Sequence, residues 1–110
     1  MIDFSEFGEL IKTRRSVRKF QDKPVPEDLL LKALELATWA PNGGNYQPWR
    51  FLIVSDKKLI NQMADAVKAK TELIAAWPEA KQFGEVVERW RKASDFFRGA
   101  PVCMAVLMGK

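Results

Sequence analysis

Residues 40–54 read Ala-Pro-Asn-Gly-Gly-Asn-Tyr-Gln-Pro-Trp-Arg-Phe-Leu-Ile-Val, a turn-forming segment followed at once by an apolar run. Residues 42–45 predict a turn, because glycine and asparagine accept positive φ. Residues 49–54 predict a buried strand, because the run is short and rich in aromatic and β-branched side chains. We call residues 40–48 the amide loop. Its amides and backbone N–H groups suit a flat heterocycle, although an ordinary helix-to-strand loop is the simpler interpretation of these residues alone.

The segment before the amide loop predicts a helix from about residue 27 to 39. Pro26 suits a first helical turn, and Glu27 and Asp28 favour the positive end of the helix dipole. Leucine and alanine side chains cover nearly the whole circumference of this helix, and Pro41 ends it. A helix that is apolar on most sides is buried, so we expect it in the core or under a partner subunit.

The rest of the chain predicts three more helices and a second strand. A short helix is expected over residues 4–13, one after the capping residue Asp56, and one from about 79 to 98. A final strand is expected over residues 102–108. The expected class is therefore α+β, with helices flanking a central sheet and residues 1–110 forming one domain. Two strands are fewer than the four to six of a typical sheet, so we expect partners to supply the rest or the chain to be part of a larger domain.

The positive charge of the chain is concentrated near its N-terminal end. The net charge is +4, yet residues 12–23 alone hold six basic residues and one acidic residue. Within this block lies the basic segment, residues 14–20, Arg-Arg-Ser-Val-Arg-Lys-Phe. Guanidinium groups bind phosphate bidentately, so the segment could hold a phosphate monoester. Taken alone, the segment is more simply interpreted as a solvated charge cluster at a helix end, and contact with nucleic acid or acidic lipid is a further alternative.

Composition excludes several kinds of chemistry. The chain has no histidine and a single cysteine, Cys103, so it builds no Ser-His-Asp or Cys-His triad and no histidine or multi-cysteine metal site. Cys103 sits in the expected final strand and is interpreted as a small core residue. Residues 100–108 are the longest uncharged apolar run, too short to cross a bilayer. We expect a cytoplasmic protein without metal or membrane association. Any catalysis would use carboxylates, lysine or arginine side chains, backbone dipoles or a bound cofactor.

Taken together, these segments resemble a known family. The basic segment, the Pro-Glu-led helix and the pattern Ala-Pro-x-x-x-Asn-x-Gln-Pro-Trp-x-Phe over residues 40–51 resemble, in order and spacing, the N-terminal half of the nitroreductase family of FMN-dependent oxidoreductases. The likeness is close over residues 5–56, whereas residues 57–100 match only as helices. The resemblance implies a helix-rich, homodimeric α+β fold, of which this chain is an incomplete domain with its C-terminal half apparently absent.

The resemblance also implies a cofactor site shared between two subunits. Proteins of this family bind the FMN phosphate or pyrimidine edge with residues that correspond to Arg14, Arg15, Ser16 and Arg18. The residues that reach the isoalloxazine from the other subunit correspond to Pro41, Asn42, Gly43, Asn45 and Gln47. Family members often have serines after the proline, where this chain has Asn42 and Gly43. No side chain is assigned a catalytic role, because the flavin carries the chemistry.

The activity implied is that of an oxidoreductase with a ping-pong mechanism. NADH or NADPH would reduce FMN, and a nitroaromatic or quinone-like acceptor would then take the electrons. Two alternatives stay open. One is a truncated, non-catalytic flavin-fold fragment, and the other is a same-fold relative that dehalogenates, desaturates or degrades flavin. Nucleic-acid binding is not expected, because Trp39, Trp49 and Trp90 sit at core-like positions in apolar faces.

Overall fold

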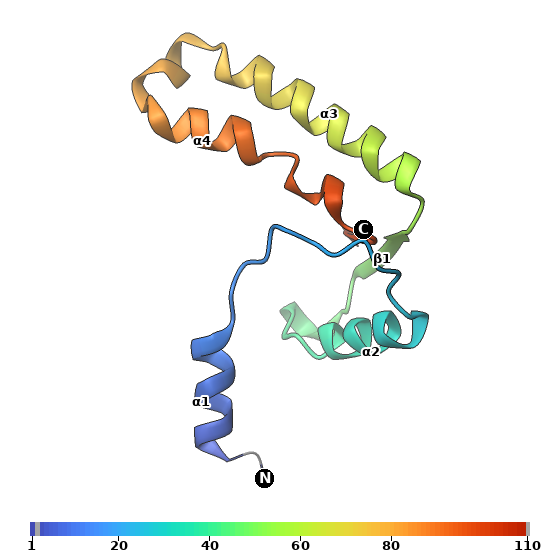
Figure 1. Ribbon diagram of the computed structural model, residues 1–110. Helices are drawn as coiled ribbons and strands as arrows, with labels where there is room; N and C mark the ends of the chain where they lie inside the picture. Colours follow the sequence, from blue (N-terminus) through green and yellow to red (C-terminus); the bar gives the residue numbers. More distant parts are fainter. Residues whose placement is uncertain (2, 110) are drawn as a thin grey trace.

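The structure is a computed structural model that describes residue 1 and residues 3–109. Its α-helices are α1 (Phe4–Thr13), α2 (Glu27–Thr38), α3 (Lys57–Ala75) and α4 (Glu85–Ala93). Short 3-10 helices are η1 (Gly43–Asn45), η2 (Pro78–Phe83) and η3 (Phe96–Gly99). The strands are β1 (Trp49–Val54) and β2 (Cys103–Met108). Figure 1 shows α3 and α4 as a hairpin, with α2 on the other side of the strands.

The two strands pair with each other in one antiparallel sheet. Trp49 lies opposite Met108, and Val54 lies opposite Cys103, so the register covers both strands completely. The strand expected over residues 49–54 is confirmed, and the second strand begins one residue later than expected. The expected burial of residues 49–54 is wrong, because only Val54 is buried and Leu52 and Ile53 are exposed. Because the strands are antiparallel and joined by the α3–α4 hairpin, the start of β1 and the end of β2 meet at one end of the sheet.

A small core forms where the other end of this sheet meets the start of α3. Ile60 and Ala64 are completely buried, and Val54 and Ala100 are nearly so. The expected helix face that includes Ile60 and Ala64 is therefore the face that packs inward. Asp56 caps the helix, because its carboxylate accepts a hydrogen bond from the Lys58 backbone N–H at 2.8 Å. This core fixes the strands and α3 as one framework.

The continuous helix expected from about residue 79 to 98 is wrong. The structure divides this stretch into η2, α4 and η3. The first break is at Gly84, whose φ of 45° and ψ of −115° lie outside the helical region. Glycine takes such a conformation because it has no Cβ, and the helical hydrophobic pattern on both sides conceals the break in the sequence. The second break lies at Asp95, which precedes η3 with φ −104° and ψ 23°.

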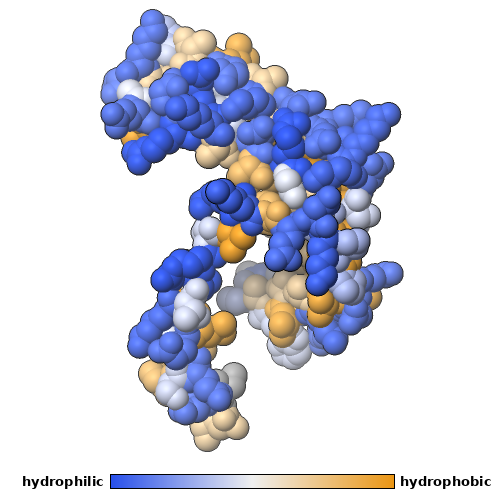
Figure 2. Space-filling view, in the orientation of Figure 1, coloured by the Kyte–Doolittle hydropathy of each residue, from blue (hydrophilic) through white to orange (hydrophobic). Residues whose placement is uncertain are grey.

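Helices α1 and α2 stand away from this framework. The radius of gyration is 17.8 Å, whereas a domain of this length that folds back on itself has about 13 Å. Leu36 and Trp39 are 74% and 80% exposed, so burial of the 27–39 helix in the core of this chain, one of two expected locations, is wrong. Figure 2 shows apolar surface on both sides of the open space between α1 and the rest of the molecule.

Among the described residues, no helix is both long enough and apolar enough to cross a bilayer.

Candidate functional site

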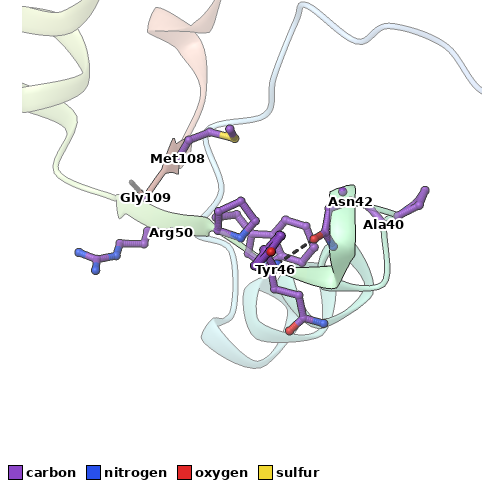
Figure 3. Close-up of a pocket in the computed structure, with 11 residues that line it drawn as sticks. Ala40, Asn42, Tyr46, Arg50, Met108 and Gly109 are labelled. Atoms are coloured by element: carbon purple, nitrogen blue, oxygen red, sulfur yellow. Dashed lines mark hydrogen bonds between the residues drawn. The ribbon is translucent and has the colours of Figure 1, made fainter.

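An open pocket lies at the end of the sheet where β1 begins and β2 ends. Its volume is about 890 Å³, within the range of small-molecule sites. The amide loop forms one wall, and β1 and the end of β2 form the other (Figure 3). The lining residues are Ala40, Pro41, Asn42, Gly43, Tyr46, Gln47, Pro48, Trp49, Arg50, Met108 and Gly109. Four of the five predicted loop residues, all except Asn45, therefore border one cavity.

The amide loop is held in shape by its own side chains. The Asn42 Oδ1 accepts a hydrogen bond from the Gln47 backbone N–H at 2.8 Å, drawn as a dashed line in Figure 3. The Gln47 Nε2 donates to Asn45 Oδ1 at 3.2 Å. Within the turn, the Asn45 N–H donates to the Asn42 carbonyl at 3.2 Å. These bonds make the loop a closed unit, which orders the side chains that line the pocket.

Three residues of the amide loop have left-handed backbone conformations. Their φ values are 61° at Gly44, 54° at Asn45 and 50° at Gln47. Glycine takes this conformation freely and asparagine tolerates it, but for glutamine it costs free energy. A Cβ on Gly44 would lie 2.6 Å from Cε2 of the Tyr46 ring. The loop therefore stores strain beside the pocket, as functional segments often do.

The strands supply pocket residues that sequence reasoning missed. Met108 borders the pocket because it lies opposite Trp49 in the sheet, and Gly109 follows it. The Gly109 N–H donates to the Pro48 carbonyl at 2.6 Å, which ties the loop to the end of β2. Arg50 also lines the pocket. Antiparallel pairing of the two predicted strands was the signal that could have placed Met108 beside Trp49.

The basic segment lies elsewhere in the chain. It follows the end of α1 and is exposed throughout, and none of Arg14, Arg15, Ser16 or Arg18 lines the pocket. The Arg15 Nη1 donates to the carbonyls of Lys12 and Arg14, at 2.6 and 2.8 Å. The Arg18 guanidinium lies over the Phe96 ring, 5.8 Å from its centroid. Within one chain, the two predicted parts of the cofactor site are thus separate.

The remaining titratable groups offer no separate reaction centre. Burial raises the pKa of the Cys103 thiol, so it is less nucleophilic at neutral pH, although the nearby Lys57 charge acts in the opposite direction. Across residue 1 and residues 3–109, no three His, Cys, Asp or Glu side chains group together as a metal site would require. The chemistry that the described site can support is binding and orientation of a planar ligand.

Comparison with known proteins places this fold among the nitroreductase-like proteins. The Nitroreductase family matches residues 11–109, nearly the whole chain. The chain belongs to the nitroreductase family. The resemblance inferred from the basic segment and the amide loop is confirmed, and so is the helix-rich α+β fold expected from it.

The similar proteins include enzymes with different reactions. The iodotyrosine deiodinase of Thermotoga neapolitana is 34% identical, over 93% of this chain and 55% of that protein. A crystal structure of oxidized iodotyrosine deiodinase bound to FMN and 3-iodo-L-tyrosine has a TM-score of 0.72 at 31% identity, over 90% of this chain and 54% of that one. An FMN-dependent nitroreductase from Clostridium difficile R20291 has a TM-score of 0.71 at 26% identity, over 94% and 45%.

The chain spans about half the length of these proteins. That coverage agrees with the expectation of an incomplete domain.

Proposed function

We propose that this chain contributes to an FMN site in a homodimeric oxidoreductase that uses NADH or NADPH to reduce small organic acceptors. The pocket beside the amide loop is the observation that carries this proposal. It offers amide donors and acceptors, two aromatic walls and a volume of about 890 Å³. The FMN-bound iodotyrosine deiodinase and the FMN-dependent nitroreductase, together with the family match, support the choice of flavin over other planar ligands.

The exposed cations fit the phosphate end of the same cofactor. Among the described residues, neither Arg14 nor Arg18 forms an ion pair with a carboxylate, whereas Arg91 and Arg98 are paired. Unpaired guanidinium groups retain their N–H forks for an anion. Arg15 uses only Nη1 in its hydrogen bonds to backbone carbonyls. Ser16 adds a hydroxyl between these cations. This donor set fits a phosphate monoester.

The basic segment and the amide loop are separate within one chain, which supports assembly of the cofactor site from two copies. The basic segment of one copy would bind the phosphate, and the amide loop of the other would orient the isoalloxazine ring. Burial of the exposed apolar faces of α1 and α2 in the same interface would supply the driving force for association. The expected partner of the 27–39 helix is therefore a second copy of this chain.

When bound, FMN would accept a hydride from the nicotinamide and pass reducing equivalents to a second substrate. The side chains of this chain would bind the flavin and orient its ring. Asn42, Gly43 and Gln47 would hold the edge of the ring, and the hydrogen bonds within the loop keep these residues in place. Tyr46 and Trp49 line the pocket and would offer aromatic faces to the ring. Arg15 would favour negative charge on the reduced ring, because guanidinium donors stabilise an anion.

FMN titration of the chain tests this proposal. Arg14→Ala and Arg18→Ala should each weaken FMN binding by about 1.5–3 kcal/mol, the range for a hydrogen bond to a charged group. Lys58→Ala is the matched control, because Lys58 lies on α3, outside the basic segment and the pocket lining. Unchanged flavin affinity in both arginine variants would reject the phosphate role. Stopped-flow reduction with NADH and with NADPH would then identify the donor.

Reductive dehalogenation of a halogenated aromatic is the second candidate function. The 34% identity to an iodotyrosine deiodinase, over 93% of this chain, is the observation that favours it. Turnover of 3-iodo-L-tyrosine and of a nitroaromatic by the flavin-loaded protein should be compared under the same reductant. Iodide release without nitro reduction would select this function, and the opposite pattern would select nitro reduction.

A further inference from the structure

We propose that Phe96 is a positioning residue for phosphate binding, because its ring holds the Arg18 guanidinium in place. The inference rests on the proposed function, since it assumes that the basic segment binds the phosphate of FMN. It assigns a role to a residue of η3 that lies about 80 positions from the basic segment along the chain.

The basic segment has little local structure of its own. Residues 15–25 form no backbone–backbone hydrogen bond in the described part of the chain. The helix before them ends at Thr13, and the next begins at Glu27. A segment without backbone bonding loses conformational entropy when a ligand orders it, at a cost of about 1–2 kcal/mol per residue. A side-chain anchor that already orders the segment reduces this cost.

Phe96 provides that anchor through two contacts. The Arg18 guanidinium carbon lies 5.8 Å from the centroid of the Phe96 ring, within the range of a cation–π interaction. The Phe20 ring stacks on the same side chain, with centroids 6.4 Å apart and an angle of 28°. Phe20 and Phe96 are 37% and 44% exposed, so both are partly removed from water. Two residues of the basic segment are thus held by one ring.

The element that carries Phe96 is itself fixed to α3. The Arg98 guanidinium pairs with Asp65 at 2.8 Å and with Asp95 at 3.2 Å. The Lys57 ammonium donates to the Arg98 carbonyl at 2.8 Å. The neighbouring Phe97 ring meets Phe96 edge to face, with centroids 6.1 Å apart. These contacts fix the position of Phe96 relative to α3 independently of the basic segment.

A guanidinium over an aromatic ring keeps its ability to bind an anion. The ring interacts with the face of the cation, whereas the N–H donors point outward in the guanidinium plane. In the described residues, Arg18 makes one long hydrogen bond, from Nη1 to the Ser16 carbonyl at 3.5 Å, and no ion pair. Its other donors are available to a phosphate. Phe96 thus orders Arg18 without competing for the atoms that would bind the ligand.

Binding of FMN and of riboflavin, followed by quenching of flavin fluorescence, tests this inference. Riboflavin lacks the phosphate, so the ratio of the two dissociation constants isolates the phosphate contact. Phe96→Leu should weaken FMN binding about two- to fivefold, the effect of one cation–π contact, and leave riboflavin binding unchanged. Phe96→Tyr keeps the ring and should retain the wild-type ratio. Phe83→Leu is the matched control, since Phe83 is an exposed phenylalanine of η2.

A second comparison separates this role from general destabilisation. In an Arg18→Ala background, Phe96→Leu should no longer change the ratio of the FMN and riboflavin dissociation constants, because the cation is already absent. An unchanged ratio of the two dissociation constants in Phe96→Leu, including the case in which both ligands are weakened equally, would overturn the inference while the proposed function stands. Wild-type protein that binds FMN no better than riboflavin would overturn the phosphate role itself. If Phe96→Leu does not fold, Phe96→Met provides the same comparison with an unbranched side chain.

Discussion

Replacement of Gly44 by alanine should destabilise the protein because of backbone strain in the amide loop. The φ of Gly44 is 61°, where an L-residue costs about 1–2 kcal/mol. The new Cβ would also lie 2.6 Å from Cε2 of Tyr46. That ring is 84% exposed and can rotate away, so the contact adds little to the cost. It would, however, move one wall of the pocket.

Gly43→Ala is the matched control for stability, because Gly43 is the adjacent glycine of the same loop. Its φ is not positive, and a Cβ there would have no heavy atom within 4 Å. Any glycine-to-alanine change also stabilises by restricting the unfolded chain, by about 0.4–1 kcal/mol. This contribution is common to both variants and cancels in their difference. The difference in unfolding free energy between them should therefore be about 1–2 kcal/mol.

Urea unfolding followed by tryptophan fluorescence measures this difference. Gly44→Asn should fall between the two alanine variants, since asparagine tolerates the left-handed region but still adds a Cβ. Equal stability of Gly43→Ala and Gly44→Ala, within about 0.3 kcal/mol, would refute the strain argument. A loss at Gly44→Asn as large as at Gly44→Ala would instead attribute the cost to the Tyr46 contact.

Three further predictions concern the core, the response to acid and the cofactor. Ile60→Ala should cost about 2–5 kcal/mol in urea unfolding, because Ile60 is completely buried, whereas truncation of exposed Leu73 should cost far less. The hydrogen bond from Arg98 holds the pKa of Asp95 below its ordinary 3.8, so its stabilisation is present above that pH and is lost as pH falls through the folded-state value. In a plot of unfolding free energy against pH, Asp95→Asn should therefore reduce the loss of stability at acid pH. The same acid dependence in the variant and the wild type would contradict the role given to Asp95. FMN at 100 times its dissociation constant should raise the unfolding free energy by about 2.7 kcal/mol, and no shift would indicate that the chain does not bind it.

Sequence reasoning succeeded where the signal is local. Pro26 with Glu27 and Asp28 predicted the start of α2, and the apolar run over residues 49–54 predicted β1, because caps and periodicity depend on neighbouring residues alone. It failed at Gly84, where the hydrophobic pattern continues through a break that only the backbone conformation reveals. The pairing of Trp49 with Met108 was likewise not predicted, because strand register depends on residues far apart in the chain.

The sequence by itself determined the family, since the basic segment and the amide loop carry it through residue order and spacing. It also determined that four predicted loop residues share a wall, because a short loop brings its own members together. The tertiary structure decided what lies opposite them, namely Met108 and Gly109 from the far end of the chain. It also decided that the basic segment lies apart from the pocket and against Phe96. Such contacts depend on how distant segments pack, which no local pattern of residues encodes.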